Sequence, residues 1–404
     1  MINMYFIFCI IKQLCIICLI LPLILSNKLL SGKLSNIIKY FMTQGGPLFI
    51  KTLQWITQKE ELSFLLCLNS IKDIQYYCNL KNEKYAKDTL QKYDKNIKII
   101  SYLGSGSIAQ VYKCSFENKI VAVKILHKNI YNIMKANIFI AKIFTRFSQK
   151  FNLVPLLKSY DIDTILSEHM RQCDLQSEAQ NTIFLKNKNN INEINFVEIY
   201  SCNKNIIVEE YFEGYKFDEF IKIYPQFTIL AKRIQMTAFL NMLFCFDIIY
   251  GDCHDGNILF NVIDDQVHAY FIDCGIYHTI TDEFKDILYK MFIGYNTKNA
   301  DLQISLYEKY NDINEIDKME LKKLLLNAMN ENRRSNNFSV YIKKIIEINR
   351  KYKLCGHYLF DILCVNILLI LGSHNNILFD TVKFVLKERK YTELCKKLEQ
   401  YKFN

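Results

Sequence analysis

Proline, glycine and tryptophan are scarce in this chain, with 4, 12 and 1 of them among 404 residues. We interpret this bias, together with the abundance of Ile, Asn, Lys and Tyr, as mutational in origin and not functional. Arginine is rare as well. Although the formal net charge is +10, the lysines are scattered and form no basic stripe interleaved with aromatic residues, so nucleic-acid binding is not expected.

Metal-binding and hydrolase motifs are missing too. The 14 cysteines lie mostly inside apolar runs, which indicates buried, reduced thiols. Cys15 and Cys18 form a close pair, but no second pair completes a tetrahedral zinc site. His127, His268 and His278 have no metal-ligand spacing and are expected to be surface or core residues. No Gly-x-Ser-x-Gly elbow of a serine hydrolase stands out.

The amino-terminal segment is hydrophobic. Residues 4–25 are almost wholly apolar apart from Lys12 and Gln13, and roughly 20 such residues are enough for a helix to cross a bilayer. A secretory cleavage site is poor, and a transit peptide would be rich in arginine, which first occurs at Arg146. We therefore expect residues 1–26 to be a membrane anchor or a targeting segment of a membrane-associated protein.

The rest of the chain has the composition of a folded protein, with 50% hydrophobic and 23% charged residues. Apolar residues at three- and four-residue spacing indicate helices after the first segment, and short runs rich in β-branched residues then indicate strands. A strand-rich lobe followed by a helical lobe is an α+β arrangement with a cleft between the lobes. The expected parts are segment 1–26, a helical extension 27–98, a small lobe 99–214 and a large helical lobe 215–404.

A glycine-bearing hairpin lies between two of the expected strands, and the sequence Val-Ala-Val-Lys follows it. Two glycines in a hairpin are more often only a turn, but a lysine on the next strand favours a phosphate-binding role. The glycines let the backbone approach phosphates, and the ammonium contacts their oxygens. The residues expected to bind nucleotide are Gly104, Ser105, Gly106, Ser107, Ala109, Val111 and Lys124.

A second polar constellation lies in the helical lobe. Asp252 and Asn257 share one loop, and Asp273 follows a later strand in the sequence Asp-Cys-Gly. Such residues are usually turn formers, but this spacing is typical of phosphoryl transfer, in which one carboxylate lies near the acceptor while an amide and a second carboxylate hold Mg²⁺. Glu178, on an expected helix, is the candidate partner that orients Lys124 through an ion pair.

These segments together resemble the UbiB/aarF-domain-containing (ABC1-type) atypical kinase family, in the branch with a Gly-Ser-Gly nucleotide loop. The resemblance covers residues 45–285 and is most specific before the kinase-like fold, where residues 46–54 are similar to the family's Gly-Pro-x-Phe-Ile-Lys-x-Gly-Gln signature. It implies a protein-kinase-like two-lobed fold with a helical N-terminal extension. It also implies that Lys51 and Gln54 project into the nucleotide site. The chain departs from the family pattern at Leu53, Gln172, Tyr250, Cys253 and Asp255, the last two of which replace proline.

The resemblance implies binding of ATP or ADP with Mg²⁺, and either ATP hydrolysis or phosphorylation of a small or lipid-like molecule. Family members are linked to coenzyme Q biosynthesis and lipid homeostasis, so the implied partners are a membrane lipid or quinone-like molecule and a membrane-bound biosynthetic complex. A mitochondrial membrane is the implied location. Two alternatives stay open: a nucleotide-switched pseudokinase scaffold, and a phosphotransferase of the choline-kinase or aminoglycoside type.

Overall fold

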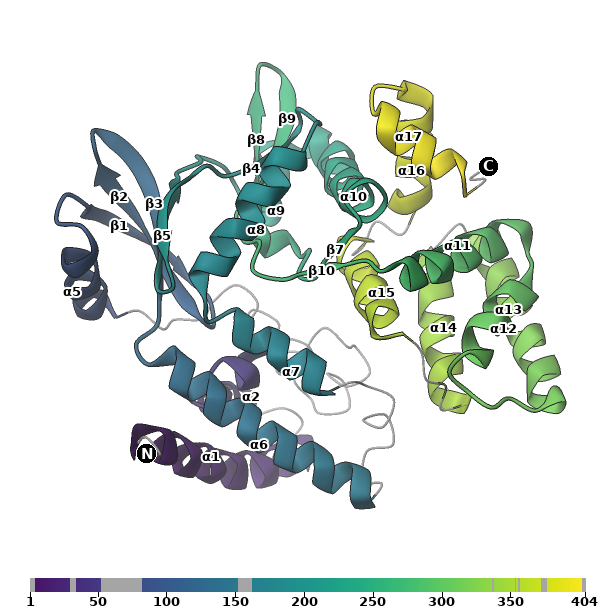
Figure 1. Ribbon diagram of the computed structural model, residues 1–404, viewed down its shortest axis with the longest axis horizontal. Coiled ribbons are helices and arrows are strands. Elements are labelled where there is room, and N and C mark those ends of the chain that lie inside the picture. The colour runs from purple at the N-terminus through teal and green to yellow at the C-terminus, as the bar shows by residue number, and fades with distance from the viewer. Residues whose placement is uncertain are drawn as a thin grey trace. The chain divides into compact units, whose positions relative to one another are not determined.

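The computed structural model describes residues 4–29, 34–51, 82–151, 162–335, 338–352, 354, 357–371 and 376–401. Leu53 and Gln54 lie outside the described residues. The chain divides into two compact units. Unit 1 comprises Met1–Phe151, Ile162–Gln180 and Val197–Phe212, and unit 2 comprises Asn152–Asp161, Asn181–Phe196 and Glu213–Asn404. Strands and helices are mixed, as the sequence predicts, and each unit is described separately below (Figure 1).

Unit 1 contains a five-stranded antiparallel sheet in the order β1-β2-β3-β6-β5. Its central strands β3 and β6 are buried on both faces. One face packs against helix α5 around Tyr112 and Val123. The turn between β2 and β3 uses Glu117 and Asn118, both at positive φ, which suits a tight hairpin. The elements of the sheet are β1 (Lys98–Ser105), β2 (Ala109–Phe116), β3 (Lys119–Leu126), β5 (Ile199–Asn203), β6 (Ile206–Glu210) and α5 (Glu83–Tyr93).

Helices α6 (Ile130–Phe151), α7 (Ile162–Arg171) and α8 (Leu175–Lys188) follow the first three strands. Sequence periodicity predicts one continuous helix over residues 166–185, but the structure breaks it in two. The reason is Asp174, whose carboxylate accepts hydrogen bonds from the backbone N–H groups of Gln176 and Ser177 and so caps the start of α8. Helix α8 begins in unit 1 and ends in unit 2.

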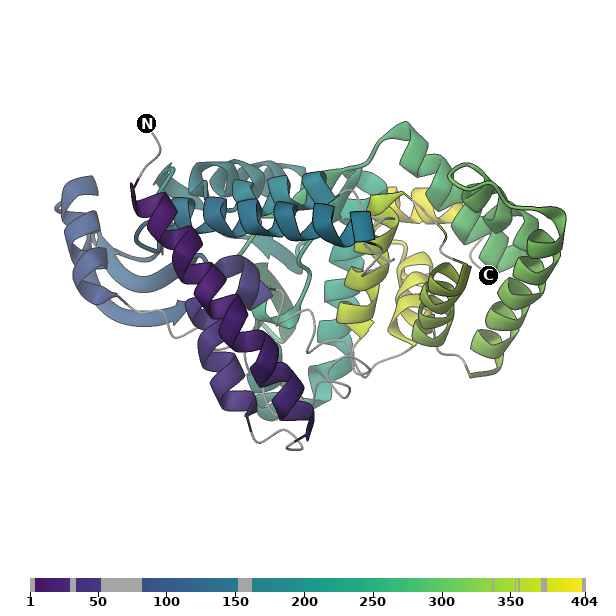
Figure 2. The same ribbon diagram turned by 90° about the horizontal axis from the view of Figure 1, so that it is seen from below.

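The hydrophobic amino-terminal segment forms helix α1 (Met4–Leu29), which packs against α6 and against α2 (Ser35–Gln44) in unit 1 (Figure 2). Ile16 and Ile20 of α1 meet Ile38 and Met42 of α2, all of them buried. The side-chain amide of Gln13 donates to the carbonyl oxygen of Ile133 on α6 at 3.3 Å.

Within the described ranges, no helix combines the length and the apolar character needed to cross a membrane. The expectation of a spanning helix near the amino terminus is thus not met among the described residues. One side of α1 packs against α2 and α6.

Unit 2 is built around helix α10, whose side chains from Ala231 to Phe244 are nearly all buried. This buried helix belongs to one large apolar cluster of the unit. The helices of unit 2 are α9 (Phe217–Ile223), α10 (Thr228–Cys245), α11 (Asp282–Thr297), α12 (Ala300–Glu308), α13 (Glu315–Ser335), α14 (Phe338–Tyr352), α15 (Tyr358–Leu371), α16 (Ile377–Glu388) and α17 (Thr392–Glu399).

Two small sheets position the polar loops of unit 2. One has the order β4-β9-β8 and the other pairs β10 with β7. The hairpin between β8 and β9 turns at Asp264 and Asp265, both at positive φ. The strands are β4 (Ile194–Phe196), β7 (Ile248–Tyr250), β8 (Ile258–Ile263), β9 (Gln266–Phe271) and β10 (Tyr277–Thr279), with a 3₁₀ turn η4 (Asp255–Asn257) before β8 and another, η3 (Pro225–Phe227), before α10.

Candidate functional site

Lys124 and Glu178 form an ion pair inside unit 1. The ammonium Nζ lies 2.5 Å from the carboxylate Oε1, and the two side chains are only 12% and 8% exposed. Lys124 comes from the middle of the sheet, where β3 lies between β2 and β6, and Glu178 comes from the first turn of α8. A charge-assisted hydrogen bond in a poorly solvated position is strong and directional. The pair therefore holds a lysine ammonium in one orientation at the face of the sheet.

The glycine-bearing segment at the end of β1 is a short turn closed by the backbone N–H of Gly106, which donates to the carbonyl of Ala109 at 2.9 Å. Neither glycine has positive φ. A Cβ at Gly104 would meet nothing within 4 Å, and one at Gly106 only the Ala109 oxygen at 3.9 Å. The glycines are thus not required by packing within the chain, and they leave the surface of the turn bare for a ligand.

His127 holds this turn from the end of β3. Its Nε2 lies 3.0 Å from the carbonyl oxygen of Gly106 and 3.2 Å from Oγ of Ser105. Burial lowers the pKa of His127 from its ordinary value, and the Gly106 carbonyl opposes that shift. The neutral ring with its proton on Nε2 can donate to Gly106. The sequence gives no signal for this contact, because an isolated histidine after a strand is usually a core or surface residue.

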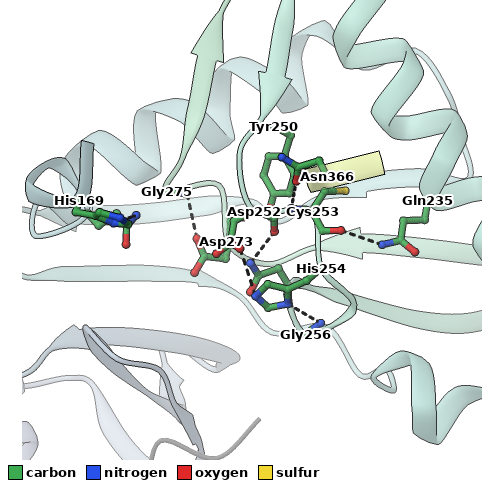
Figure 3. A network of polar contacts seen from close by, with 12 residues as sticks. His169, Gln235, Tyr250, Asp252, Cys253, His254, Gly256, Asp273, Gly275 and Asn366 are labelled. Carbon is green, nitrogen blue, oxygen red and sulfur yellow. Dashed lines mark hydrogen bonds and ion pairs between the residues drawn. The ribbon is translucent and has the colours of Figure 1, made fainter. Parts of the chain in front are cut away.

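The loop after β7 folds around His254 (Figure 3). The backbone N–H of Gly256 donates to Nδ1 of His254 at 3.0 Å, so the ring proton of the neutral tautomer is on Nε2, which lies 3.5 Å from Oδ1 of Asp252. The amide Nδ2 of Asn257 donates to the backbone carbonyl of Asp252 at 3.0 Å. About a third of the Asp252 side chain is exposed, so its carboxylate can meet an acceptor hydroxyl or water.

The loop after β9 is joined to this one by the backbone. The N–H of Ile272 donates to the carbonyl of Asn257 at 3.0 Å. Oδ1 of Asp273 accepts from the N–H of Gly275 at 3.0 Å, and the buried Tyr250 hydroxyl donates to the Asp273 carbonyl (Figure 3). Burial raises the pKa of Tyr250 well above its usual range, which keeps this hydroxyl protonated.

Asn257 and Asp273 suit Mg²⁺ by their chemistry. Magnesium prefers oxygen ligands and is commonly held by one or two carboxylates together with substrate phosphates. The side-chain nitrogen of Asn257 donates to the carbonyl of Asp252, so the side-chain oxygen of Asn257 faces away from that carbonyl. Over the described residues there is no cluster of three or more His, Cys, Asp or Glu side chains that could hold a metal without such phosphates.

Three departures from the family pattern acquire partners in unit 2. Tyr250 bonds the Asp273 backbone as described above. The backbone N–H of Cys253, which a proline would lack, donates to Oδ1 of Asn366 at 2.9 Å. Asp255 forms an ion pair with the buried Lys232 at 2.6 Å. Neither Lys232 nor Asn366 is predicted by any motif in the sequence.

Gln172, a fourth departure, is buried, and its amide lies 3.5 Å from Nδ1 of His169. Two residues further on, Asp174 caps α8 and thereby supports the turn that carries Glu178. The departure at Gln172 therefore leaves the helix cap in place.

The signature segment is described only at its beginning. Gly46 has a φ of +102°, and a Cβ there would lie 2.6 Å from Ile133 of α6, so glycine is needed for both conformation and close approach. Asn137 of α6 donates from Nδ2 to the carbonyl of Gly45 at 2.9 Å. Lys51 is half-buried on a helical turn of unit 1, and its expected contact with nucleotide stays a prediction, as does that of Gln54.

The structure brings the predicted residues together in two groups. Lys124 and Glu178 are bonded to each other in unit 1, where the turn from Gly104 to Val111 also lies. In unit 2 the side-chain amide of Asn257 donates to the carbonyl of Asp252, and the N–H of Ile272, the residue before Asp273, donates to the carbonyl of Asn257. Ser107, Ala109 and Val111 follow the glycines, and Val111 pairs directly with Lys124 across β2 and β3.

Comparison with known proteins agrees with this geometry. The family model described as "ABC1 atypical kinase-like domain" matches residues 69–305. The chain is 26% identical over 237 residues to the probable serine/threonine-protein kinase abkC of Dictyostelium discoideum, covering 55% of this chain and 34% of that protein. It is 24% identical over 292 residues to the probable protein kinase UbiB of Shewanella pealeana, covering 67% of this chain and 52% of that protein.

The chain thus spans about a third to a half of the length of these curated relatives. Among solved structures, the complex of Rv3197 with erythromycin from Mycobacterium tuberculosis matches with a TM-score of 0.43 and 20% identity, over 59% of this chain and 65% of that one.

Proposed function

Because the chain belongs to the family of the ABC1 atypical kinase-like domain, we propose that it binds ATP with Mg²⁺ and catalyses hydrolysis or transfer of the terminal phosphoryl group. The observation that carries this proposal is the ion pair between Lys124 and Glu178. Enclosing two charges costs desolvation energy that the pair itself hardly recovers, so such a pair is weak evidence for stability. An oriented ammonium is what a nucleotide phosphate requires.

Each group of residues has a task in this proposal. Lys124 contacts the α- and β-phosphates and Glu178 keeps it oriented, while the bare turn at Gly104 and Gly106 covers the phosphates. Asn257 and Asp273 would hold Mg²⁺, which when bound neutralises charge on the phosphate oxygens.

Asp252 orients the attacking hydroxyl or water and accepts its proton as the oxygen bonds to the γ-phosphorus, while the bond from that phosphorus to the β-phosphate oxygen breaks and ADP leaves. Its contact with His254 Nε2 at 3.5 Å keeps the carboxylate facing one way. Lys51 and Gln54 retain the role that the family resemblance implies for them, which is to enter the nucleotide site and to obstruct protein substrates.

The acceptor in this proposal is small or lipid-like, in keeping with the family's link to coenzyme Q and lipid homeostasis. Support for a membrane setting comes from α1, whose outward side exposes Met4, Ile7, Phe8, Ile11 and Leu14 at helical spacing. Helices α1, α2 and α6 contain no acidic residue but several basic ones. An apolar face with basic surroundings suits a helix lying in the surface of an anionic bilayer. The family resemblance favours a mitochondrial membrane.

The proposal is tested by mixing the full chain with Mg-ATP or Mg-ADP and recording its melting temperature and the release of phosphate. Lys124→Ala removes the proposed phosphate-binding ammonium of unit 1, and Asp273→Asn removes the charge of a proposed Mg²⁺ ligand of unit 2. Lys119→Ala is the matched control, because Lys119 lies on the same strand as Lys124 but is exposed and lies over Tyr200.

A Mg-dependent rise in melting temperature that both variants lose and the control keeps, with phosphate release or transfer, supports the enzyme. The same rise without phosphate release or transfer would instead mean a nucleotide-switched scaffold. No rise under any condition would remove the nucleotide site altogether.

A further inference from the structure

Lys232 is a lysine on the buried helix α10 with only 2% of its side chain exposed. Its ammonium donates to Oδ1 of Asp255 at 2.6 Å and to Oε1 of Gln235 at 3.0 Å. It also lies 4.2 Å from the centre of the Phe217 ring, which faces the cation with its π electrons. A buried cation with this set of partners is fixed in place, and one of its partners belongs to the loop that carries Asp252 and Asn257.

Gln235 extends the contact to a second point of the same loop. Because its Oε1 accepts from Lys232, its Nε2 is directed to the other side, where it donates to the carbonyl of Cys253 at 3.3 Å. Asn366 of α15 accepts from the N–H of Cys253 at 2.9 Å, and its own Nδ2 donates to Ile362. Side chains from two helices therefore hold both backbone polar groups of Cys253, the residue next to Asp252 (Figure 3).

Hydrogen bonds within the loop connect these anchored residues to the proposed catalytic and metal-binding residues. Asp255 is the first residue of turn η4, which ends at Asn257. The Asn257 side chain donates to the carbonyl of Asp252, and its backbone N–H donates to that of His254 at 3.0 Å. A shift of Asp255 or Cys253 would thus move both Asp252 and Asn257.

We propose that Lys232 is a positioning residue for the catalytic loop, which it fastens directly through Asp255 and indirectly by orienting Gln235 toward Cys253. The family pattern has proline at positions 253 and 255, where the fixed φ stiffens the loop. In this chain, contacts from α10 and α15 replace that stiffness. The effect on turnover rests on the proposed function, whereas the fastening of the loop does not.

The first test measures the loop itself, without any nucleotide. Lys232→Met keeps the length of the side chain and removes its charge, so Asp255 and Gln235 lose their donor. Arg233→Met is the matched control, because Arg233 is the next residue of α10 and its guanidinium lies instead over Phe384 of α16. Hydrogen exchange over residues 250–258 is expected to speed up at least 10-fold in Lys232→Met and to stay near the wild-type rate in Arg233→Met.

The second test asks whether the fastening matters for chemistry. Lys232→Met is expected to raise the Mg²⁺ concentration for half-maximal turnover, or to lower kcat, by about 10- to 100-fold, as is usual when support of a ligand is lost. The double variant Lys232→Met with Asp255→Pro removes the unpaired carboxylate and puts proline at the first position of a turn, where it is well tolerated. It is expected to regain most of the lost activity.

Unchanged exchange in Lys232→Met would overturn the proposal, and so would faster exchange with normal Mg²⁺ dependence and kcat. Failure of the proline double variant to recover any activity, while it folds, would also overturn it. If the wild type neither binds nor turns over nucleotide, the proposed function fails, but the exchange experiment still decides whether Lys232 fastens the loop.

Discussion

The hydroxyl of Tyr250 donates a hydrogen bond to the backbone carbonyl of Asp273. Tyr250 ends β7 and is fully buried, and Asp273 follows β9 by two residues. This hydrogen bond therefore joins two parts of unit 2. One is strand β7, which leads to Asp252, and the other is the loop after β9, which carries the proposed magnesium ligand Asp273.

Replacing Tyr250 by Phe is expected to lower the free energy of unfolding by about 1–3 kcal/mol, because the carbonyl of the half-buried Asp273 loses its donor. The freed loop should also bind Mg²⁺ less tightly. Urea unfolding and the Mg²⁺ dependence of nucleotide-induced stabilisation check the two parts. Tyr200→Phe is the control, since Tyr200 is exposed on β5; an equal loss in both variants would contradict the assignment.

Replacing Glu178 by Gln keeps the shape of the side chain but removes the carboxylate charge that lies 2.5 Å from the ammonium of Lys124. We expect a loss of about 1–3 kcal/mol in stability and a markedly smaller melting shift with Mg-ATP. Glu83→Gln breaks an exposed pair with Lys87 at 2.8 Å and should cost at most about 0.5 kcal/mol. If Glu178→Gln retained the full nucleotide shift, Glu178 would not orient Lys124.

His127 predicts a dependence of stability on pH. Its pKa is lowered from 6.5 by burial, so below about pH 6.5 the unfolded chain takes up a proton that the folded chain resists. Stability should therefore fall on acidification. Burial lowers the pKa of His357 as well, so His127→Gln should flatten only part of the fall between pH 7.5 and 5.5 in urea unfolding. A pH profile identical to that of the wild type would exclude His127 as a contributor.

The outward face of α1 predicts binding to anionic lipid. Flotation with vesicles of phosphatidylserine and phosphatidylcholine should recover the full chain, and vesicles of phosphatidylcholine alone should recover less. The double variant Phe8→Asp with Ile11→Asp places charges on that face and should abolish recovery. Ile263→Asp is the control, because Ile263 is also apolar and exposed but lies at the end of β8 in unit 2. Equal recovery of both variants would refute the lipid-facing role of α1.

Local spacing was enough to predict the strands and loops that carry the candidate site residues, whose roles stay predictions. The alternation around Lys124 predicts a strand, and β3 is that strand; Asp252, Asn257 and Asp273 likewise lie in loops beside short strands. The fold class was predictable for the same reason. The family match also favours the ABC1-type interpretation over the choline-kinase type, which has motifs similar to those around Asp252 and Asp273.

Contacts between residues that are far apart in the chain could not be predicted from the sequence. Lys232 and Asn366 lie 23 and 113 residues from their loop partners, and no periodicity connects them. The run from Phe196 to Tyr200 predicts one strand, but the chain crosses between sheets there, so β4 pairs with β9 and β5 with β6. Hydropathy likewise shows that α1 is apolar but not that one side of it is covered by α2 and α6.

The backbone N–H of Cys253 limits how this loop can evolve. A return to proline at that position would remove the hydrogen and leave Oδ1 of the buried Asn366 without its donor. Proline at position 255 would likewise leave the Lys232 ammonium buried without its carboxylate. Proline at either position is therefore compatible with this loop only if α10 or α15 changes as well.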